Sequence, residues 1–125
     1  MNTITISAGD ISLRAELYDT RAAAEILNSL PFEGAANIWG DEIYFEIPVV
    51  MDQEPDARAD VEVGELGYWP VGHAFCIFFG ATPASIDERP RAASPVNVFG
   101  RIVGDAAVFR AVPHGTLVRV IRDES

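Results

Sequence analysis

The sequence predicts a mostly β protein: one domain, residues 1–125, in which eight short strands close into a barrel and one longer and one short α-helix cover its ends. Two observations carry this prediction. Apolar and polar residues alternate in about eight short segments, the pattern of strands with one buried face. Turn residues separate these segments roughly every eight to twelve residues, which is typical of barrels and sandwiches. Closing the sheet into a barrel would remove its unpaired edges.

The amino-terminal part of the chain predicts a hairpin and then a helix. Residues 3–7 and 11–17 alternate on either side of a Gly-Asp turn. A helix of about three turns follows, because Asp19 or Thr20 can accept hydrogen bonds from its first amides. Pro31 ends the helix, since the residue before a proline avoids the α conformation. The apolar stripe of this helix consists of Ala23, Ile26, Leu27 and Leu30.

A second hairpin and an acidic loop follow the helix. Residues 36–38 and 43–47 alternate around another Gly-Asp turn. Pro48 ends or kinks the second of these strands, because proline has no amide to donate to a ladder. Residues 52–60 are polar and charged, which predicts a loop, and residues 61–63 predict a further short strand.

The longest apolar run, Ala74 to Phe79, predicts a strand that is covered on both faces. It is too short to span a bilayer as a helix, which takes about 20 residues. If the odd-numbered residues from Phe75 to Phe79 face the main core, the even-numbered residues from Ala74 to Phe78 face the other way.

The last third of the chain predicts a loop, two strands and a short helix. Residues 82–95 contain three prolines and no strand pattern, so they predict a long surface loop that can serve as a lid. Residues 96–103 predict a strand interrupted at Gly100. Residues 106–111 predict the short helix, and residues 116–122 predict the final strand.

Composition argues against several classes of partner. Nine basic and nineteen acidic side chains give a formal charge of -10, which repels nucleic acid and anionic membranes. The only cysteine, Cys76, cannot form an intrachain disulfide. The first ten residues lack the basic and apolar regions of a signal peptide. We therefore expect a cytoplasmic protein without nucleic-acid or membrane partners.

Two groups of residues resemble metal sites, and both fail on spacing. His73 and Cys76 are three residues apart, which places them on opposite faces of a strand, and no second pair accompanies them. The acidic residues of 52–60 lack the glycine that an EF-hand calcium loop requires. We expect neither a metal nor a cofactor.

Several tracts resemble the cyclophilins. Residues 11–30 are similar to the cyclophilin opening strand and first helix, and residues 45–53, Phe-Glu-Ile-Pro-Val-Val-Met-Asp-Gln, resemble a segment that lines the cyclophilin pocket. Residues 98–102, Val-Phe-Gly-Arg-Ile, match another cyclophilin strand. The tract 68–85 is typical of small bacterial and archaeal cyclophilin-like proteins of unassigned activity. The resemblance covers nearly the whole chain and implies a cyclophilin-like barrel.

The same resemblance implies an altered active site. Cyclophilins carry an arginine where this chain has Glu46, and that arginine donates hydrogen bonds to the twisting prolyl amide, whose rotation barrier is about 18–20 kcal/mol. An ionised carboxylate can only accept. Met51 and Gln53 match pocket residues of the family, whereas Ala74 and Cys76 replace a glutamine and a phenylalanine. The expected tryptophan and histidine before the Val-Phe-Gly strand are also absent. The resemblance therefore implies a retained scaffold with most isomerase residues lost.

One face of the predicted barrel is the candidate ligand site. An apolar cleft with a few polar groups, the usual composition of such sites, would be formed by Tyr44, Glu46, Met51, Gln53, Trp69, Ala74, Cys76 and Phe78. The alternative is that residues 82–95 fold over this face as a second small core. Trp69 likewise either stacks on a proline or another flat ligand or packs as part of a corner.

Three functions follow from these features. The first is a cyclophilin-like binding module for a small molecule or an extended, proline-containing peptide. The second is a weak peptidyl-prolyl cis-trans isomerase. The third is an assembly protein that forms a homodimer through the apolar face.

Overall fold

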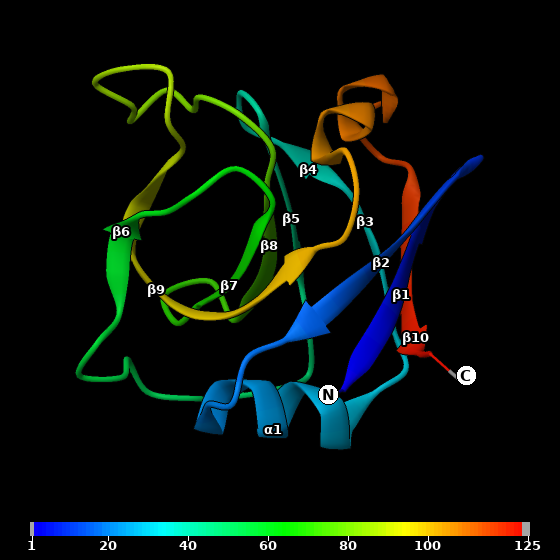
Figure 1. Cartoon of the computed structure of the whole chain (residues 1–125), viewed down its shortest axis with the longest axis vertical. Coiled ribbons are helices and arrows are strands. Elements are labelled where there is room, and N and C mark those ends of the chain that lie inside the picture. The colour runs from blue at the N-terminus through cyan, green and yellow to red at the C-terminus, as the bar shows by residue number, and fades with distance from the viewer. Residues whose placement is uncertain (1, 124–125) are drawn as a thin grey trace.

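Ten strands, one α-helix and one 3₁₀ helix make up the computed structural model, which describes residues 2–123 (Figure 1). The mostly β class with two helices is therefore confirmed. The elements are β1 (Thr3–Ala8), β2 (Ile11–Leu17), α1 (Arg21–Ser29), β3 (Phe32–Ala35), β4 (Asn37–Ile38), β5 (Glu42–Glu46), β6 (Arg58–Asp60), β7 (Glu65–Trp69), β8 (Ala74–Phe78), β9 (Arg91–Ile102), η1 (Ala106–Ala111) and β10 (Leu117–Arg122).

The predicted closed, eight-stranded barrel is wrong in both closure and strand number. Nine strands are hydrogen-bonded in the order β3-β10-β1-β2-β9-β7-β8-β5-β4, and β6 pairs with β9 outside this path. Within residues 2–123 no ladder joins the two end strands, β3 and β4. They cannot pair as a hairpin because Ala36 alone separates them, and an antiparallel hairpin needs at least two connecting residues. The amide and carbonyl of Ala36 instead bond to the backbone of Thr116 and Gly115.

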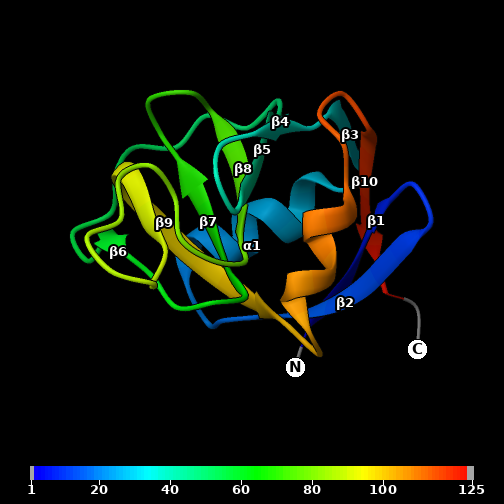
Figure 2. The same ribbon diagram turned by 90° about the horizontal axis from the view of Figure 1, so that it is seen from above.

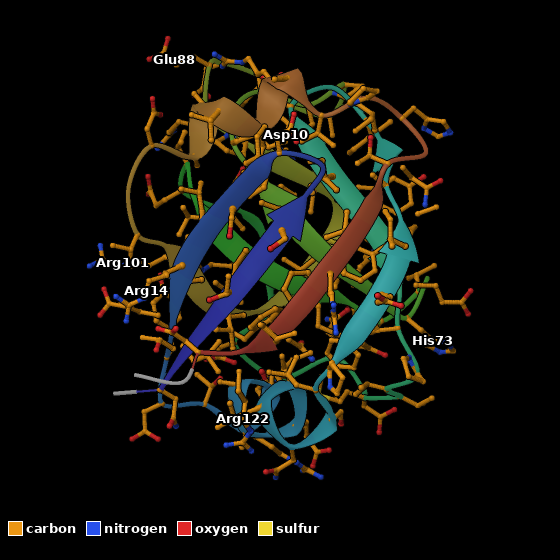
Figure 3. All side chains as sticks on the ribbon, turned by 90° about the vertical axis from the view of Figure 1, so that its right-hand side faces the viewer. Asp10, Arg14, His73, Glu88, Arg101 and Arg122 are labelled. Atoms are coloured by element: carbon orange, nitrogen blue, oxygen red, sulfur yellow. The ribbon has the colours of Figure 1, made fainter. Side chains whose placement is uncertain are left out.

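The first hairpin and the helix after it form as the sequence predicts. β1 and β2 pair from Thr3↔Glu16 to Ala8↔Ile11. Of the two possible caps, Thr20 is the one used: its hydroxyl accepts a hydrogen bond of 3.1 Å from the Ala23 amide. The second helix differs from the prediction because it is a 3₁₀ helix rather than an α-helix. The two helices lie at opposite ends of the layer formed by β1, β2, β3 and β10 (Figure 3).

Alternation along β8 divides the buried residues into two cores, as predicted. The odd-numbered residues Phe75, Ile77 and Phe79 belong to the main core. The even-numbered residues Ala74, Cys76 and Phe78 belong to a smaller second core. The main core also contains Ile4, Ile6, Ile26, Phe45, Phe99 and Phe109, all of which are almost fully buried.

The predicted loop over residues 82–95 is wrong in its second half, and so is the predicted break at Gly100. β9 begins at Arg91 and continues through both Pro95 and Gly100, pairing with β2, β7 and β6. Pro95 is tolerated because it lies where the pairing with β6 is irregular, between Asp60↔Arg91 and Arg58↔Val96. A Cβ atom at Gly100 would lie 2.6 Å from the Glu16 carbonyl oxygen, so glycine permits the close approach of β2.

The short strand predicted for residues 61–63 is also displaced. The strand is β6, which ends at Asp60, immediately before that segment. Figures 1 and 2 place β6 and the start of β9 on the opposite side of the molecule from β1 and β10. None of the helices among the described residues is long and apolar enough to cross a membrane.

Candidate functional site

The candidate site begins at the tight turn between β4 and β5. Trp39 and Glu42 exchange two backbone hydrogen bonds, of 3.0 and 3.2 Å, across Gly40 and Asp41. Gly40 has a φ of 60°, the left-handed conformation that glycine adopts without strain. The turn therefore holds the Trp39 and Glu42 backbones next to each other.

Glu42, Tyr44 and Glu46 share the face of β5 that points away from the main core, because alternate residues of a strand lie on one face. Across the ladder they stand opposite Phe78, Cys76 and Ala74, respectively, on β8. The sequence predicts this face as the ligand site.

The chain itself covers most of this face. Val61, Ala92 and Val96 pack on Ala74, Cys76 and Phe78 to complete the second core. The Thr82 hydroxyl bonds to the Arg91 carbonyl oxygen. The Ser85 hydroxyl donates a hydrogen bond of 2.6 Å to the Arg89 carbonyl oxygen. Of the two predicted alternatives, the structure shows a second small core over the middle of this face, formed by the start of β9 rather than by a mobile lid.

A cavity of about 230 Å³ remains where the second core ends. Its walls come from the β4–β5 turn, from β5 and β7, and from the start of β9. The residues that line it are Trp39, Glu42, Tyr44, Trp69, Ala92, Ala93 and Val96.

Three contacts of the Trp69 indole fix its position at the aromatic side of the cavity. The rings of Tyr44 and Trp69 meet edge to face, with centroids 6.2 Å apart and planes at 76°. The Trp69 indole Nε1 donates a hydrogen bond of 2.6 Å to the Ser94 hydroxyl. A Cβ atom at Gly72 would lie 2.6 Å from two carbons of the indole, so the backbone packs directly on the ring.

Glu42 is the only charged side chain among the residues that line this cavity. It is 5% exposed, and its Oε1 has no hydrogen-bond partner within residues 2–123. Burial raises the pKa of Glu42 to about 7, while the neighbouring Cys76 thiol acts in the opposite direction. Burial, followed by the nearby Glu42 carboxylate, raises the pKa of the Cys76 thiol well above its usual value. The thiol is therefore protonated and unreactive.

A second buried carboxylate, Glu65, provides a contrast. It is also 5% exposed, yet it accepts two hydrogen bonds from Arg58, of 2.9 and 3.0 Å, and one of 2.8 Å from the Tyr18 hydroxyl. The Glu62 amide donates a further hydrogen bond of 2.8 Å. Buried polar groups are normally satisfied in this way, so the unpaired oxygen of Glu42 stands out within the same molecule.

The residues predicted for the ligand site lie in four different environments. Tyr44 and Trp69 line the cavity, whereas Ala74, Cys76 and Phe78 are buried in the second core, away from solvent. Glu46 is exposed. Met51 and Gln53 line a separate hollow of about 430 Å³, together with Arg21 and Glu25 of α1.

The sequence analysis did not identify Trp39, Glu42, Ala92 or Ala93 as site residues. Glu42 alternates with Ile43 in a strand, so its pattern predicts an exposed position, whereas the cavity that it lines has a wall from β9, about fifty residues later in the chain. The one local signal for this site in the sequence is the position of Trp39, directly before the two-residue turn Gly40-Asp41. Among the described residues, no group of three or more histidine, cysteine or acidic side chains could hold a metal ion.

Comparisons with known proteins extend over nearly the whole chain. A family model described as "Cyclophilin-like" matches residues 2–121. The chain is 38% identical in sequence to a hypothetical protein from Archaeoglobus fulgidus, and its structure matches the solution structure of that protein with a TM-score of 0.81. The match covers 98% of this chain and 95% of that one. A comparison with curated proteins found no match.

Proposed function

Because the chain belongs to the cyclophilin-like family, we propose that it is a binding module whose site is the cavity between the β4–β5 turn and the start of β9. The observation that carries this proposal is the buried carboxyl group of Glu42, whose Oε1 has no hydrogen-bond partner among the described residues, in an otherwise apolar and aromatic cavity. Leaving a buried polar group unsatisfied costs about 1–3 kcal/mol or more. A ligand that donates a hydrogen bond would remove that cost.

The dimensions of the cavity support a small molecule over an extended peptide. Ligand pockets usually measure about 300–1,000 Å³, and this cavity, at about 230 Å³, is smaller. Apolar walls with one well-placed polar group are also the usual composition of such a site. The second core fills the middle of the face on which a longer peptide would lie.

The test is a titration of ¹⁵N-labelled protein with small aromatic and aliphatic fragments. We expect a binding fragment to shift the indole N–H signals of Trp39 and Trp69 and the backbone amide signal of Ala93. Ala93→Phe should weaken this binding, because the larger side chain would occupy the cavity.

Ala35→Phe is the matched control, since Ala35 is likewise an exposed strand residue but does not line the cavity. It should leave the shifts unchanged. Failure of every fragment to perturb these signals, or an equal effect of the two phenylalanine variants, would contradict the proposed function.

A further inference from the structure

The charges at the cavity restrict the ligands that it can take. No basic side chain is among its lining residues, and Glu42 contributes an acidic group. An anionic ligand would be buried there without a partner, beside a carboxylate, and burying an unpaired charge is very unfavourable. The net charge of -10 adds repulsion at longer range. Carboxylates and phosphates are therefore excluded as ligands.

The aromatic lining favours a positive charge. Tyr44 and the two tryptophans, Trp39 and Trp69, all line one small cavity. The face of an aromatic ring attracts a cation within about 6 Å of its centre, and tryptophan does so most strongly. Aromatic walls together with a carboxylate provide two separate sources of attraction for an ammonium group.

The surroundings of Glu42 allow it to ionise when a cation arrives. The titratable groups that face it are the Cys76 thiol on β8 and the Tyr44 phenol on its own strand, while the start of β9 contributes only Ala92, Ala93 and Val96 to the lining. No other formal charge competes for the carboxyl group at the cavity. With a pKa of about 7, Glu42 can release its proton near neutral pH when a positive partner compensates for its burial.

We propose that this cavity binds a small organic ammonium ion, whose N–H groups donate to the Glu42 carboxylate and whose carbon skeleton lies against Trp39, Tyr44 and Trp69. This inference rests on the proposed binding function and specifies its ligand class. The binding is non-covalent, and the proton that Glu42 loses passes to solvent.

Two probes that differ in charge but are nearly equal in shape test the inference: benzylamine, as its ammonium ion, and benzyl alcohol. Calorimetric titration at about pH 8, where Glu42 is mostly ionised, should give an affinity at least about tenfold higher for the ammonium ion. Lowering the pH to about 5.5 should remove most of this preference, because Glu42 then retains its proton. The affinity for benzyl alcohol should change little.

Glu42→Gln should abolish the preference for the ammonium ion, so that the two probes bind with similar affinities. Glu88→Gln is the control because it makes the same change in net charge at an exposed residue that points away from the body of the molecule (Figure 3). It should leave both affinities unchanged.

Each remaining outcome contradicts a specific statement. If both probes bind equally, or benzyl alcohol binds better, the cavity is a binding site but not one for ammonium ions. If Glu42→Gln and Glu88→Gln lower the preference for the ammonium ion equally, long-range attraction to the net charge explains that preference. This result would also overturn the inference. If neither probe binds, the inference fails, and failure of the broader fragment titration as well would remove the proposed function.

Discussion

The indole Nε1 of Trp69 donates a hydrogen bond of 2.6 Å to the Ser94 hydroxyl. This bond joins the end of β7 to the part of β9 that forms one wall of the cavity. Trp69 is also in contact with Tyr44 and with the backbone of Gly72. The position of the indole ring therefore depends on β5 and β9, which are far from Trp69 in the sequence, and on the turn directly after β7.

Ser94→Ala should lower the free energy of unfolding by about 0.5–1.5 kcal/mol, because it removes a partly buried hydrogen bond. Urea denaturation followed by tryptophan fluorescence would measure the change. Ser12→Ala is the matched control, since Ser12 is an exposed strand residue whose hydroxyl makes only a 3.3 Å contact with Ser7. Equal effects of the two substitutions would show that the bond to Trp69 does not stabilise the fold.

Glu42→Gln should stabilise the protein at alkaline pH. The folded protein holds the pKa of Glu42 at about 7, above the value of about 4.3 for an unfolded chain. Between these values the folded state binds more protons than the unfolded state, so stability falls as the pH rises. At about pH 8 the variant should be more stable by about 3–4 kcal/mol.

The same comparison at about pH 3, where the carboxyl group is protonated in both states, should show no such gain. Urea denaturation across this pH range gives both values. Glu88→Gln should give no gain at either pH, because that side chain is exposed. Equal stability of wild type and Glu42→Gln at alkaline pH would contradict the unpaired burial of the carboxylate.

Glu65→Gln should have the opposite pH dependence. Burial opposes ionisation of Glu65, but hydrogen bonds from Arg58, the Glu62 amide and Tyr18 outweigh it and leave the pKa of Glu65 below its usual value. The stabilisation is therefore present above the unfolded-state pKa and is lost as the pH falls through the lower folded-state pKa.

Near pH 7 the Glu65→Gln variant should lose about 2 kcal/mol, since it weakens hydrogen bonds to a charged group. Thermal and urea denaturation should show this difference shrinking in acid. Glu16→Gln should cost less than about 1 kcal/mol, because Glu16 and Arg101 form a partly exposed pair at 3.7 Å. A constant Glu65→Gln deficit down to strongly acidic pH would refute the pKa argument.

The protein should not accelerate cis-trans exchange in a proline-containing peptide. Glu46, at the position of the expected arginine, is an exposed residue whose carboxylate accepts hydrogen bonds but donates none. Arg101 does not replace that arginine, because its guanidinium contacts Glu16. Exchange NMR with and without the protein would test this expectation. Acceleration in proportion to protein concentration, absent after heat denaturation, would contradict it.

Local patterns predicted the elements whose partners are close in the sequence. The β1–β2 hairpin, the helix capped by Thr20 and the two faces of β8 all follow from alternation or helical spacing over a few residues. These features depend on side chains that the sequence displays next to one another.

Long-range pairing determined what the sequence analysis missed. Pro95 and Gly100 normally interrupt a strand, yet β9 continues through both because three different strands pair with successive parts of it. Glu42 has the alternation of a solvent-facing residue, yet it is buried and lines a cavity together with residues of β9. A sequence pattern that spans a few residues contains no information about packing against a segment that lies fifty residues later in the chain.

The wall that β9 gives to the cavity consists of Ala92, Ala93 and Val96, and of these three Ala93 is the exposed one. The main core receives a different residue of the same strand, Phe99, which is fully buried. Separate positions of β9 thus line the cavity and fill the main core. Replacing Ala93 with side chains of increasing volume would therefore reduce the volume of the cavity without changing the packing of the main core.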